Sequence, residues 1–179
     1  RSTGRWGNAS SLNTARYLHT ATVLSDGKIL VAGGIDSSGD ALRRCEIYDP
    51  TTNTWTYAED MFEVRVYHTA SLLPDVRVII IGGRRSSGQG STGAEVYDPS
   101  TGEWSSITVM RTPRYDHSAV VLTTGQVVVI GGYRGSSSAG YSNSVEMYNP
   151  STVPGTWTVL NNMNYRRSKH TSYVLNNGN

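Results

Sequence analysis

Residues 114–133 read RYDHSAVVLTTGQVVVIGGY, and residues 65–84 read RVYHTASLLPDVRVIIIGGR. Both stretches place an Arg three residues before a His, then two apolar runs, then a pair of glycines. The second pattern begins 49 residues before the first. A pattern that recurs at a fixed period is the signature of a repeat protein, so this period decides the fold.

The same landmarks recur over nearly the whole chain of 179 residues. Each copy holds an Arg, a His, a Gly pair, a Glu, a Tyr and a Trp at matched positions. They are Arg16, His19, Gly33, Gly34, Glu46, Tyr48 and Trp55, then Arg65, His68, Gly82, Gly83, Glu95, Tyr97 and Trp104, then Arg114, His117, Gly131, Gly132, Glu146, Tyr148 and Trp157, and finally Arg167 and His170. We interpret them as structural, because a residue present in every copy serves the architecture, whereas a binding site needs asymmetry.

Each unit is predicted to contain four short strands and no helix. In the first unit the strands are expected at Thr20–Leu24, Ile29–Ala32, Cys45–Tyr48 and from Trp55 onward. Asp26-Gly27 marks a tight hairpin turn between the first two. The near-continuous apolar run Val127–Ile130 is typical of a strand buried on both faces.

Units of about 50 residues with these landmarks resemble kelch repeats, which also build the propeller of galactose oxidase-like proteins. The resemblance implies an all-β fold, a β-propeller in which each repeat supplies one four-stranded antiparallel blade. Residues 1–179 are then a single fragment of a propeller. Its parts are expected at 1–15 (end of a preceding blade, with Trp6 in the outermost strand), 16–64, 65–113 and 114–166 (blades), and 167–179 (first strand of a following blade, at His170–Leu175).

About three and a half blades do not close a ring, since propellers close with about 4–8 blades. We therefore expect an open arc from a propeller of about six or seven blades, with the remaining blades missing from this chain. The two ends of such an arc would expose unpaired strand edges and apolar blade faces, which favour aggregation.

Some landmarks invite chemical interpretations that the pattern does not favour. The Gly pairs lack the Lys-Ser/Thr and the helix of a phosphate-binding loop, so we interpret them as backbone turns. The histidines occupy matched places in different blades, so they are expected to form structural hydrogen bonds and not to converge on a metal. Cys45 aligns with Ala94 and Val145, which predicts a small apolar slot and an inert thiol. No cofactor is predicted.

Composition excludes several classes of partner. The net charge is +2, and charged residues make up 17% of the chain. The basic residues are dispersed, which argues against nucleic acid as a partner. No run approaches the ~20 apolar residues that a membrane helix needs, so no membrane insertion is predicted. The compartment stays open, with an extracellular or cell-surface place slightly favoured over a cytoplasmic one.

Binding is expected on the face that carries the variable connections Ile35–Arg43, Arg84–Gly93 and Tyr133–Ser142, since variable loops on a rigid scaffold are where binding usually lies. By the strand order, twelve Lys and Arg and six Asp and Glu fall on this face, which makes it basic. The predicted ligand-binding residues do not repeat between copies. They are Arg84, Arg85, Tyr133, Arg134 and Tyr141.

An acidic protein partner would suit these residues, because Arg recognises carboxylates through a bidentate fork. The alternative is that the loop charges are only solvated, while the repeated arginines pair with the repeated glutamates and lock adjacent blades. For Arg16, Arg65, Arg114 and Arg167 that structural role is the favoured interpretation.

Two classes of function follow. The favoured one is a non-catalytic kelch-propeller scaffold that binds a protein or other ligand through the basic, loop-rich face, since the sequence shows no catalytic constellation. The alternative is the propeller portion of a galactose oxidase-like copper-radical oxidase, whose catalytic residues would lie outside this fragment. No residue here matches the Cys–Tyr and His ligand set of that enzyme, and fold alone does not give function.

Overall fold

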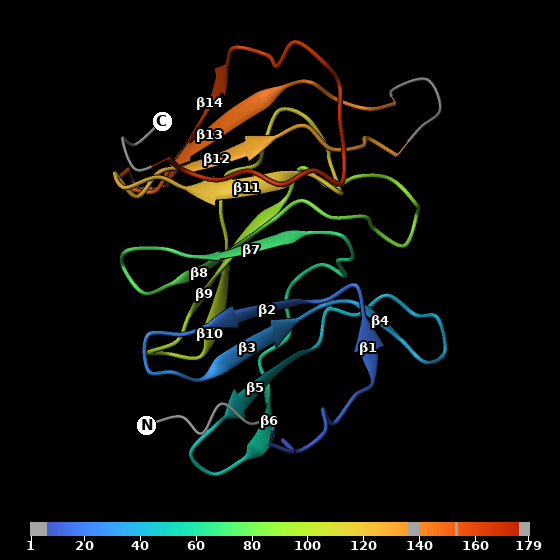
Figure 1. Cartoon of the computed structure of the whole chain (residues 1–179), viewed down its shortest axis with the longest axis vertical. Helices are drawn as coiled ribbons and strands as arrows, with labels where there is room; N and C mark the ends of the chain where they lie inside the picture. The colour runs from blue at the N-terminus through green and yellow to red at the C-terminus, as the bar shows by residue number, and fades with distance from the viewer. Residues whose placement is uncertain (1–6, 136–139, 153, 176–179) are drawn as a thin grey trace.

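The computed structural model describes residues 7–135, 140–152 and 154–175. Three four-stranded antiparallel sheets and one two-stranded sheet account for all the strands of these residues, which contain no helix. Each four-stranded sheet runs in simple up-and-down order along the chain. The all-β arc of propeller blades is therefore confirmed, and the three blades do not close a ring (Figure 1).

The first blade consists of β2 (Thr20–Val23), β3 (Ile29–Ala32), β5 (Cys45–Asp49) and β6 (Thr54–Ala58). The second consists of β7 (Thr69–Leu72), β8 (Val78–Ile81), β9 (Ala94–Asp98) and β10 (Glu103–Ser106). The third consists of β11 (Ser118–Val121), β12 (Val127–Ile130), β13 (Val145–Asn149) and β14 (Thr156–Leu160). The small sheet pairs β1 (Arg16–Tyr17) with β4 (Ile35–Asp36).

Two terminal expectations stay predictions. Trp6 and the strand expected around it lie outside the described residues. No ladder includes residues 170–175 in the described part of the chain, so the strand expected at His170–Leu175 stays a prediction.

The core lies between the blades. One cluster joins Leu30 and Met61 of the first unit to Ile80 and Trp104 of the second, and a matching cluster joins the second blade to the third. All four residues of β8 are buried, as the continuous apolar run predicts. The first strands β2, β7 and β11 lie side by side along one side of the arc (Figure 1).

The Gly pairs allow this close approach. Gly82 and Gly83 both have positive φ, at 62° and 102°, which a side chain rarely tolerates. A Cβ on Gly82 would stand 2.6 Å from the carbonyl oxygen of Arg114 and 2.8 Å from Cε1 of His117. The backbone N–H of Gly83 donates to that same carbonyl at 2.9 Å. The Gly pair is thus a backbone turn, as predicted, and it packs directly against Arg114 and His117 of the next repeat.

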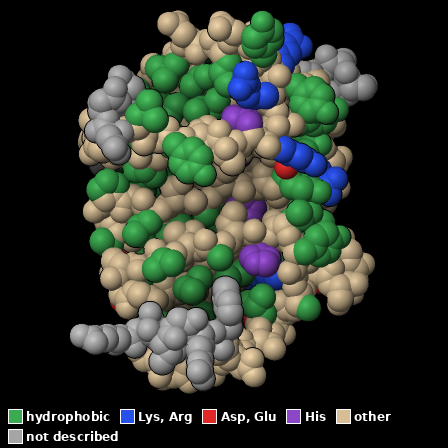
Figure 2. Space-filling model, viewed as in Figure 1, with side chains coloured by type: hydrophobic (Ala, Val, Ile, Leu, Met, Phe, Trp, Pro, Cys, Tyr) green, Lys and Arg blue, Asp and Glu red, His purple; other side chains and the backbone are tan. Residues whose placement is uncertain are grey.

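The repeated His residues connect neighbouring blades. Nε2 of His68 lies 2.8 Å from Oγ1 of Thr20, and Nε2 of His117 lies 2.9 Å from Oγ1 of Thr69. Burial lowers the pKa of His68 to about 3, helped by Arg65. Figure 2 shows histidine side chains at successive heights along the side formed by the first strands. His68 and His117 thus each form a structural hydrogen bond between blades, whereas both ring nitrogens of His170 are buried without a partner among the described residues.

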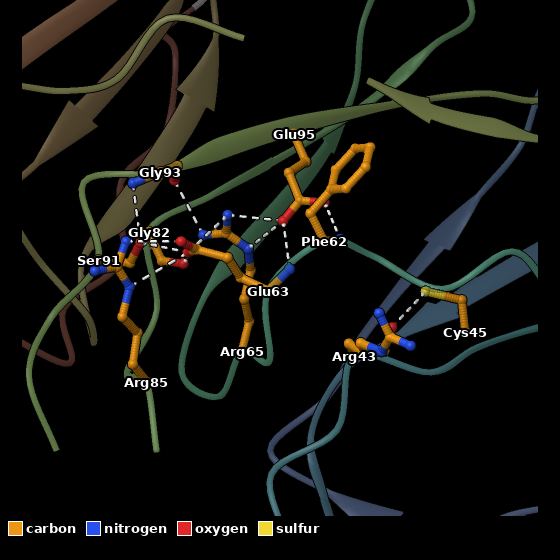
Figure 3. A network of polar contacts seen from close by, with 10 residues as sticks. All are labelled: Arg43, Cys45, Phe62, Glu63, Arg65, Gly82, Arg85, Ser91, Gly93 and Glu95. Atoms are coloured by element: carbon orange, nitrogen blue, oxygen red, sulfur yellow. Dashed lines mark hydrogen bonds and ion pairs between the residues drawn. The ribbon is translucent and has the colours of Figure 1, made fainter. Parts of the chain in front are cut away.

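The repeated Arg and Glu residues form buried ion pairs. Arg16–Glu46, Arg65–Glu95 and Arg114–Glu146 lie 2.7, 2.9 and 2.7 Å apart. Glu95 also accepts the backbone N–H groups of Phe62 and Glu63, which lie in the connection from the preceding blade (Figure 3).

Each Arg side chain pairs within its own blade, while the backbone of the same residue binds the preceding blade: the N–H of Gly34 donates to the carbonyl oxygen of Arg65 at 2.9 Å, and the N–H of Arg65 donates to Leu42 at 3.1 Å. The repeated Arg–Glu pairs therefore lock adjacent blades. The matching Glu follows each Arg by 30 to 32 residues. For Arg167 that position falls beyond residue 179, and Arg167 makes no ion pair within the described residues.

The repeated Trp and Tyr residues pack between blades, as expected. The indole N–H of Trp104 donates to the backbone oxygen of Glu59, at 2.8 Å, and that of Trp157 donates to Thr108 at 2.7 Å. Tyr97 and Trp104 contact each other with ring centroids 5.1 Å apart. Both belong to the core between the first two blades.

Candidate functional site

The connections on the loop-rich face are more ordered than their Gly- and Ser-rich sequences predict. In each repeat, the residue after the repeated Arg pairs with the first residue after the Gly pair. The three pairs are Tyr17 with Ile35, Val66 with Arg84, and Tyr115 with Tyr133. Arg84 also pairs with Gly90, and Tyr133 pairs with Tyr141. These short pairings hold each connection as a small hairpin on a fixed base.

Neighbouring connections also contact each other. The backbone N–H of Gly90 donates to the carbonyl oxygen of Arg134 at 3.0 Å, and the side-chain amide of Gln89 donates to Gly135 at 3.1 Å. The loops of the second and third blades therefore form one continuous surface. A surface held in this way presents its side chains with little loss of conformational entropy on binding.

Four tyrosines form a contiguous row on this surface. The ring centroids of Tyr67 and Tyr115 are 6.0 Å apart, those of Tyr115 and Tyr133 are 5.4 Å apart, and those of Tyr133 and Tyr141 are 5.1 Å apart. Tyr141 is 56% exposed, at the outer end of the row. In Figure 2, side chains of the hydrophobic class, which includes Tyr, gather with Lys and Arg along the right-hand edge, where Figure 1 places the long connections.

Two cations face the inner end of this tyrosine row. Cζ of Arg84 lies 5.5 Å from the ring centroid of Tyr67, and Nζ of Lys169 lies 6.0 Å from it. Both distances are within the range of cation–π attraction. Asp116 lies nearby: burial raises the pKa of its carboxyl group, and Lys169 and Arg84 oppose that shift.

A pocket opens beside Arg84. It has a volume of about 280 Å³ and lies between the connections of the first two blades. Its lining includes Asp40, Arg84, Arg85 and Ser86 on the polar side, and Ile35 and Val66 on the apolar side. Arg84 therefore stands between this pocket and the tyrosine row.

The structure brings together three of the five predicted binding residues: Arg84, Tyr133 and Tyr141. Arg85 has another partner, since its guanidinium lies 2.8 Å from a carboxylate oxygen of Glu63 (Figure 3). Arg134 contributes its backbone carbonyl to the loop surface, and its Nε is buried without a hydrogen-bond partner within the described residues.

The site contains three residues that sequence reasoning missed: Tyr67, Tyr115 and Lys169. They lie between the repeated Arg and the repeated His, where the intervening pairs read Tyr-Leu, Val-Tyr, Tyr-Asp and Ser-Lys in turn. Residues that vary inside an invariant frame were the available signal.

Three further features concern the chemistry that these residues could support. Within the described residues, no group of three or more His, Cys, Asp or Glu lies close enough to hold a metal ion. The same part of the chain contains no helix long and apolar enough to cross a membrane. Cys45 is fully buried, and burial raises the pKa of its thiol to about 12, which makes it inert as expected.

Comparison with known proteins agrees with this architecture. No curated protein matches the chain. Among solved structures, one described as the structure of YjhT superposes with a TM-score of 0.75 at 16% sequence identity. The match covers 92% of this chain and 57% of that one, so the present chain spans little more than half of that protein. At this identity the likeness shows the fold alone.

A family model provides the closer assignment. The model described as the Attractin/LZTR1 beta-propeller matches residues 2–178, which is nearly the full length. That match agrees with the kelch-type landmarks and with the three blades of the structure. The chain is therefore a partial kelch-type propeller, and it belongs to the Attractin/LZTR1 beta-propeller family.

Proposed function

We propose that this chain is a non-catalytic scaffold that binds a protein partner through its loop-rich face, with the tyrosine row as the centre of contact. The observation that carries the proposal is the row itself: Tyr67, Tyr115, Tyr133 and Tyr141 from two blades in mutual contact. Tyrosine supplies a large, rigid and amphipathic contact area, and Tyr with Arg dominates binding hot spots.

The geometry of the row supports a protein partner over flat ligands. Tyr133 meets both Tyr115 and Tyr141 at an interplanar angle of 67°, so successive rings do not share a plane. Edge-to-face contact is a favourable packing of aromatic rings and gives the row an uneven surface. Single-stranded nucleic acids, by contrast, are bound by stacking successive bases on aromatic faces. Kelch-type propellers commonly mediate protein interactions, which agrees with this class of ligand.

The charge of the face supports an acidic partner. Among the described residues, Arg84 and Lys169 lie at the row and make no ion pair, whereas Arg85 is paired with Glu63. The oxidase alternative gains no support from the described residues, since Cys45, the only cysteine, is buried and unreactive.

Selection from a displayed random peptide library, with the chain as bait, tests the proposal. We expect the selected peptides to bind Tyr141→Ala at least about tenfold more weakly than the wild type, as for a hot-spot residue. Tyr57→Ala is the matched control, because Tyr57 on β6 is 58% exposed and lies on an outer strand. Selected peptides that bind Tyr141→Ala as well as wild type, or a library that yields no binder, would contradict the proposal.

A further inference from the structure

The inner end of the tyrosine row places two positive charges against one ring. Arg84 comes from the connection after the Gly pair of the second blade, and Lys169 comes from the residue before His170. Among the described residues neither forms an ion pair within 4.0 Å. By contrast, Arg65 and Arg114 are paired with buried glutamates, and Arg85 is paired with Glu63.

The backbone holds Lys169 in this position. The residue before each repeated His is left-handed: Leu18, Tyr67, Asp116 and Lys169 have φ of 59°, 57°, 52° and 54°. The N–H of Lys169 donates to the carbonyl oxygen of Asp116 at 2.9 Å, and the N–H of Asp116 donates to Tyr67 at 3.0 Å. Tyr67, Asp116 and Lys169 therefore follow one another from blade to blade in a hydrogen-bonded chain.

A left-handed backbone in a non-glycine residue costs free energy and persists where the surrounding structure enforces it. The conformation is the same at all four positions, while the side chains are apolar, aromatic, acidic and basic. The frame thus presents a different chemical group from each blade. Asymmetry of this kind is what a recognition site requires and what a purely structural position lacks.

The carboxylate of Asp116 does not neutralise the two cations through an ion pair. Asp116 is close enough to Arg84 and Lys169 for both to affect its titration, yet it forms an ion pair with neither within 4.0 Å. Two like charges at one ring repel each other, and an anion between them would remove that repulsion. Arg binds a planar carboxylate through its fork, and Lys binds one as a point charge.

We propose that the partner binds by placing the carboxylate of an Asp or Glu side chain between Arg84 and Lys169, over the ring of Tyr67. This inference rests on the proposed function, because it assigns the chemistry of one contact within the tyrosine-row interface. Asp116 then contributes specificity: it disfavours a second acidic group on its side of the ring by like-charge repulsion.

The test uses the peptides selected on the chain that depend on Tyr141. One acidic residue of each peptide, changed to its amide, is expected to weaken binding to the wild type about tenfold, as for a desolvated charge pair. With Lys169→Gln, and with Arg84→Gln, the same change in the peptide is expected to have an effect below about twofold. Lys169 is exposed, so its variant is expected to fold normally.

Arg85→Gln is the matched control, because it removes a cation of the same loop that already has a carboxylate partner, and it should leave the dependence on the acidic residue intact. Two results overturn the carboxylate site but not the proposed binding face. In the first, the peptides need Tyr141 yet lose no affinity when any acidic residue is changed to its amide. In the second, that change costs as much affinity for Lys169→Gln as for the wild type. Peptides indifferent to Tyr141 overturn the proposed function instead.

Discussion

Arg114 and Glu146 are both almost completely shielded from water, and the pair repeats in every blade. Glu146 also accepts the N–H groups of Arg111 and Thr112, so one carboxylate fixes a turn of backbone and a guanidinium together. At the scale of the residue, these charges are tolerated in the interior because every one has a partner. Removing one partner leaves the other charge buried and unpaired.

Glu146→Ala is therefore expected to lower the free energy of unfolding by about 3–5 kcal/mol. Asp60→Ala is the control, since Asp60 faces Arg43 at 3.5 Å near the surface, and it is expected to cost about 0–1 kcal/mol. Urea unfolding followed by tryptophan fluorescence measures both. Equal losses in the two variants would show that the buried pair contributes no more than a surface pair.

The buried histidines give the stability a predictable dependence on pH. In the unfolded chain they titrate near about 6.5, while in the fold burial keeps the pKa of His68 at about 3 and that of His117 well below its usual value. Below about pH 6.5 the unfolded state thus binds more protons than the folded state. Stability is expected to fall by about 1 kcal/mol per pH unit for each histidine as the pH drops toward 3.

Urea unfolding at pH 7.5 and at pH 5.5 checks this slope. His117→Gln removes one of the two most deeply buried histidines and should flatten the dependence, even though the variant is less stable at pH 7.5. A wild-type free energy of unfolding that stays constant or rises as the pH is lowered from 7.5 to 5.5 would contradict the assignment.

At the scale of the element, the turn after the second strand determines how closely two blades approach. The end of β8 passes into Gly82-Gly83, and the backbone there contacts the repeated Arg and His of the next repeat. Strand β8 is buried on both faces only because this turn lets the third blade come close. The Gly pair and the apolar run therefore act together to pack the second blade against the third.

Gly82→Ala is expected to cost at least about 3 kcal/mol, because it adds strain at positive φ to a collision with the Arg114 carbonyl. Gly39→Ala is the matched control: its φ is +89°, but a Cβ there meets nothing within 4 Å. The control is expected to cost about 1–2 kcal/mol from backbone strain alone. Thermal unfolding of the two variants separates them, and similar melting temperatures would refute the close-approach argument.

At the scale of the whole molecule, the three blades are not equivalent. Only the second blade contacts a blade on each side within the described residues. In a linear array of repeats, stability is roughly the sum of unit terms and nearest-neighbour interfaces. The middle unit therefore has the largest share of interface.

Hydrogen exchange is expected to show this gradient. The amides of β8 and β9 should exchange most slowly, and those of β6 and β14, on outer strands of the first and third blades, should exchange fastest among the strands. Mass spectrometry of peptides after timed deuterium labelling measures the order. Uniform protection across the three blades would indicate that they unfold as one unit.

The period of the repeat was enough to predict the all-β class, the four strands of each blade and the roles of the Gly, His, Trp and Glu landmarks. Such features depend on contacts repeated at a fixed spacing. A role predicted for a position in one repeat can therefore be compared with the same position in the other repeats. The strand predicted at His170–Leu175 stays a prediction, because a strand is recognised by its ladder and residues 170–175 join none in the described part of the chain. Arg84, Tyr133 and Tyr141 were proposed as binding residues from their failure to repeat, and they lie on one surface of the structure.

Only the tertiary structure decided which non-repeating residues meet. Arg85 appeared equivalent to Arg84 in the sequence, yet it lies against Glu63, while Arg84 turns to Tyr67. Lys169 reaches the same ring from 102 positions along the chain. The sequence alone determined the architecture, because blades are built from local and periodic contacts. The site depends on side chains from different blades, and their meeting is set by how those blades pack.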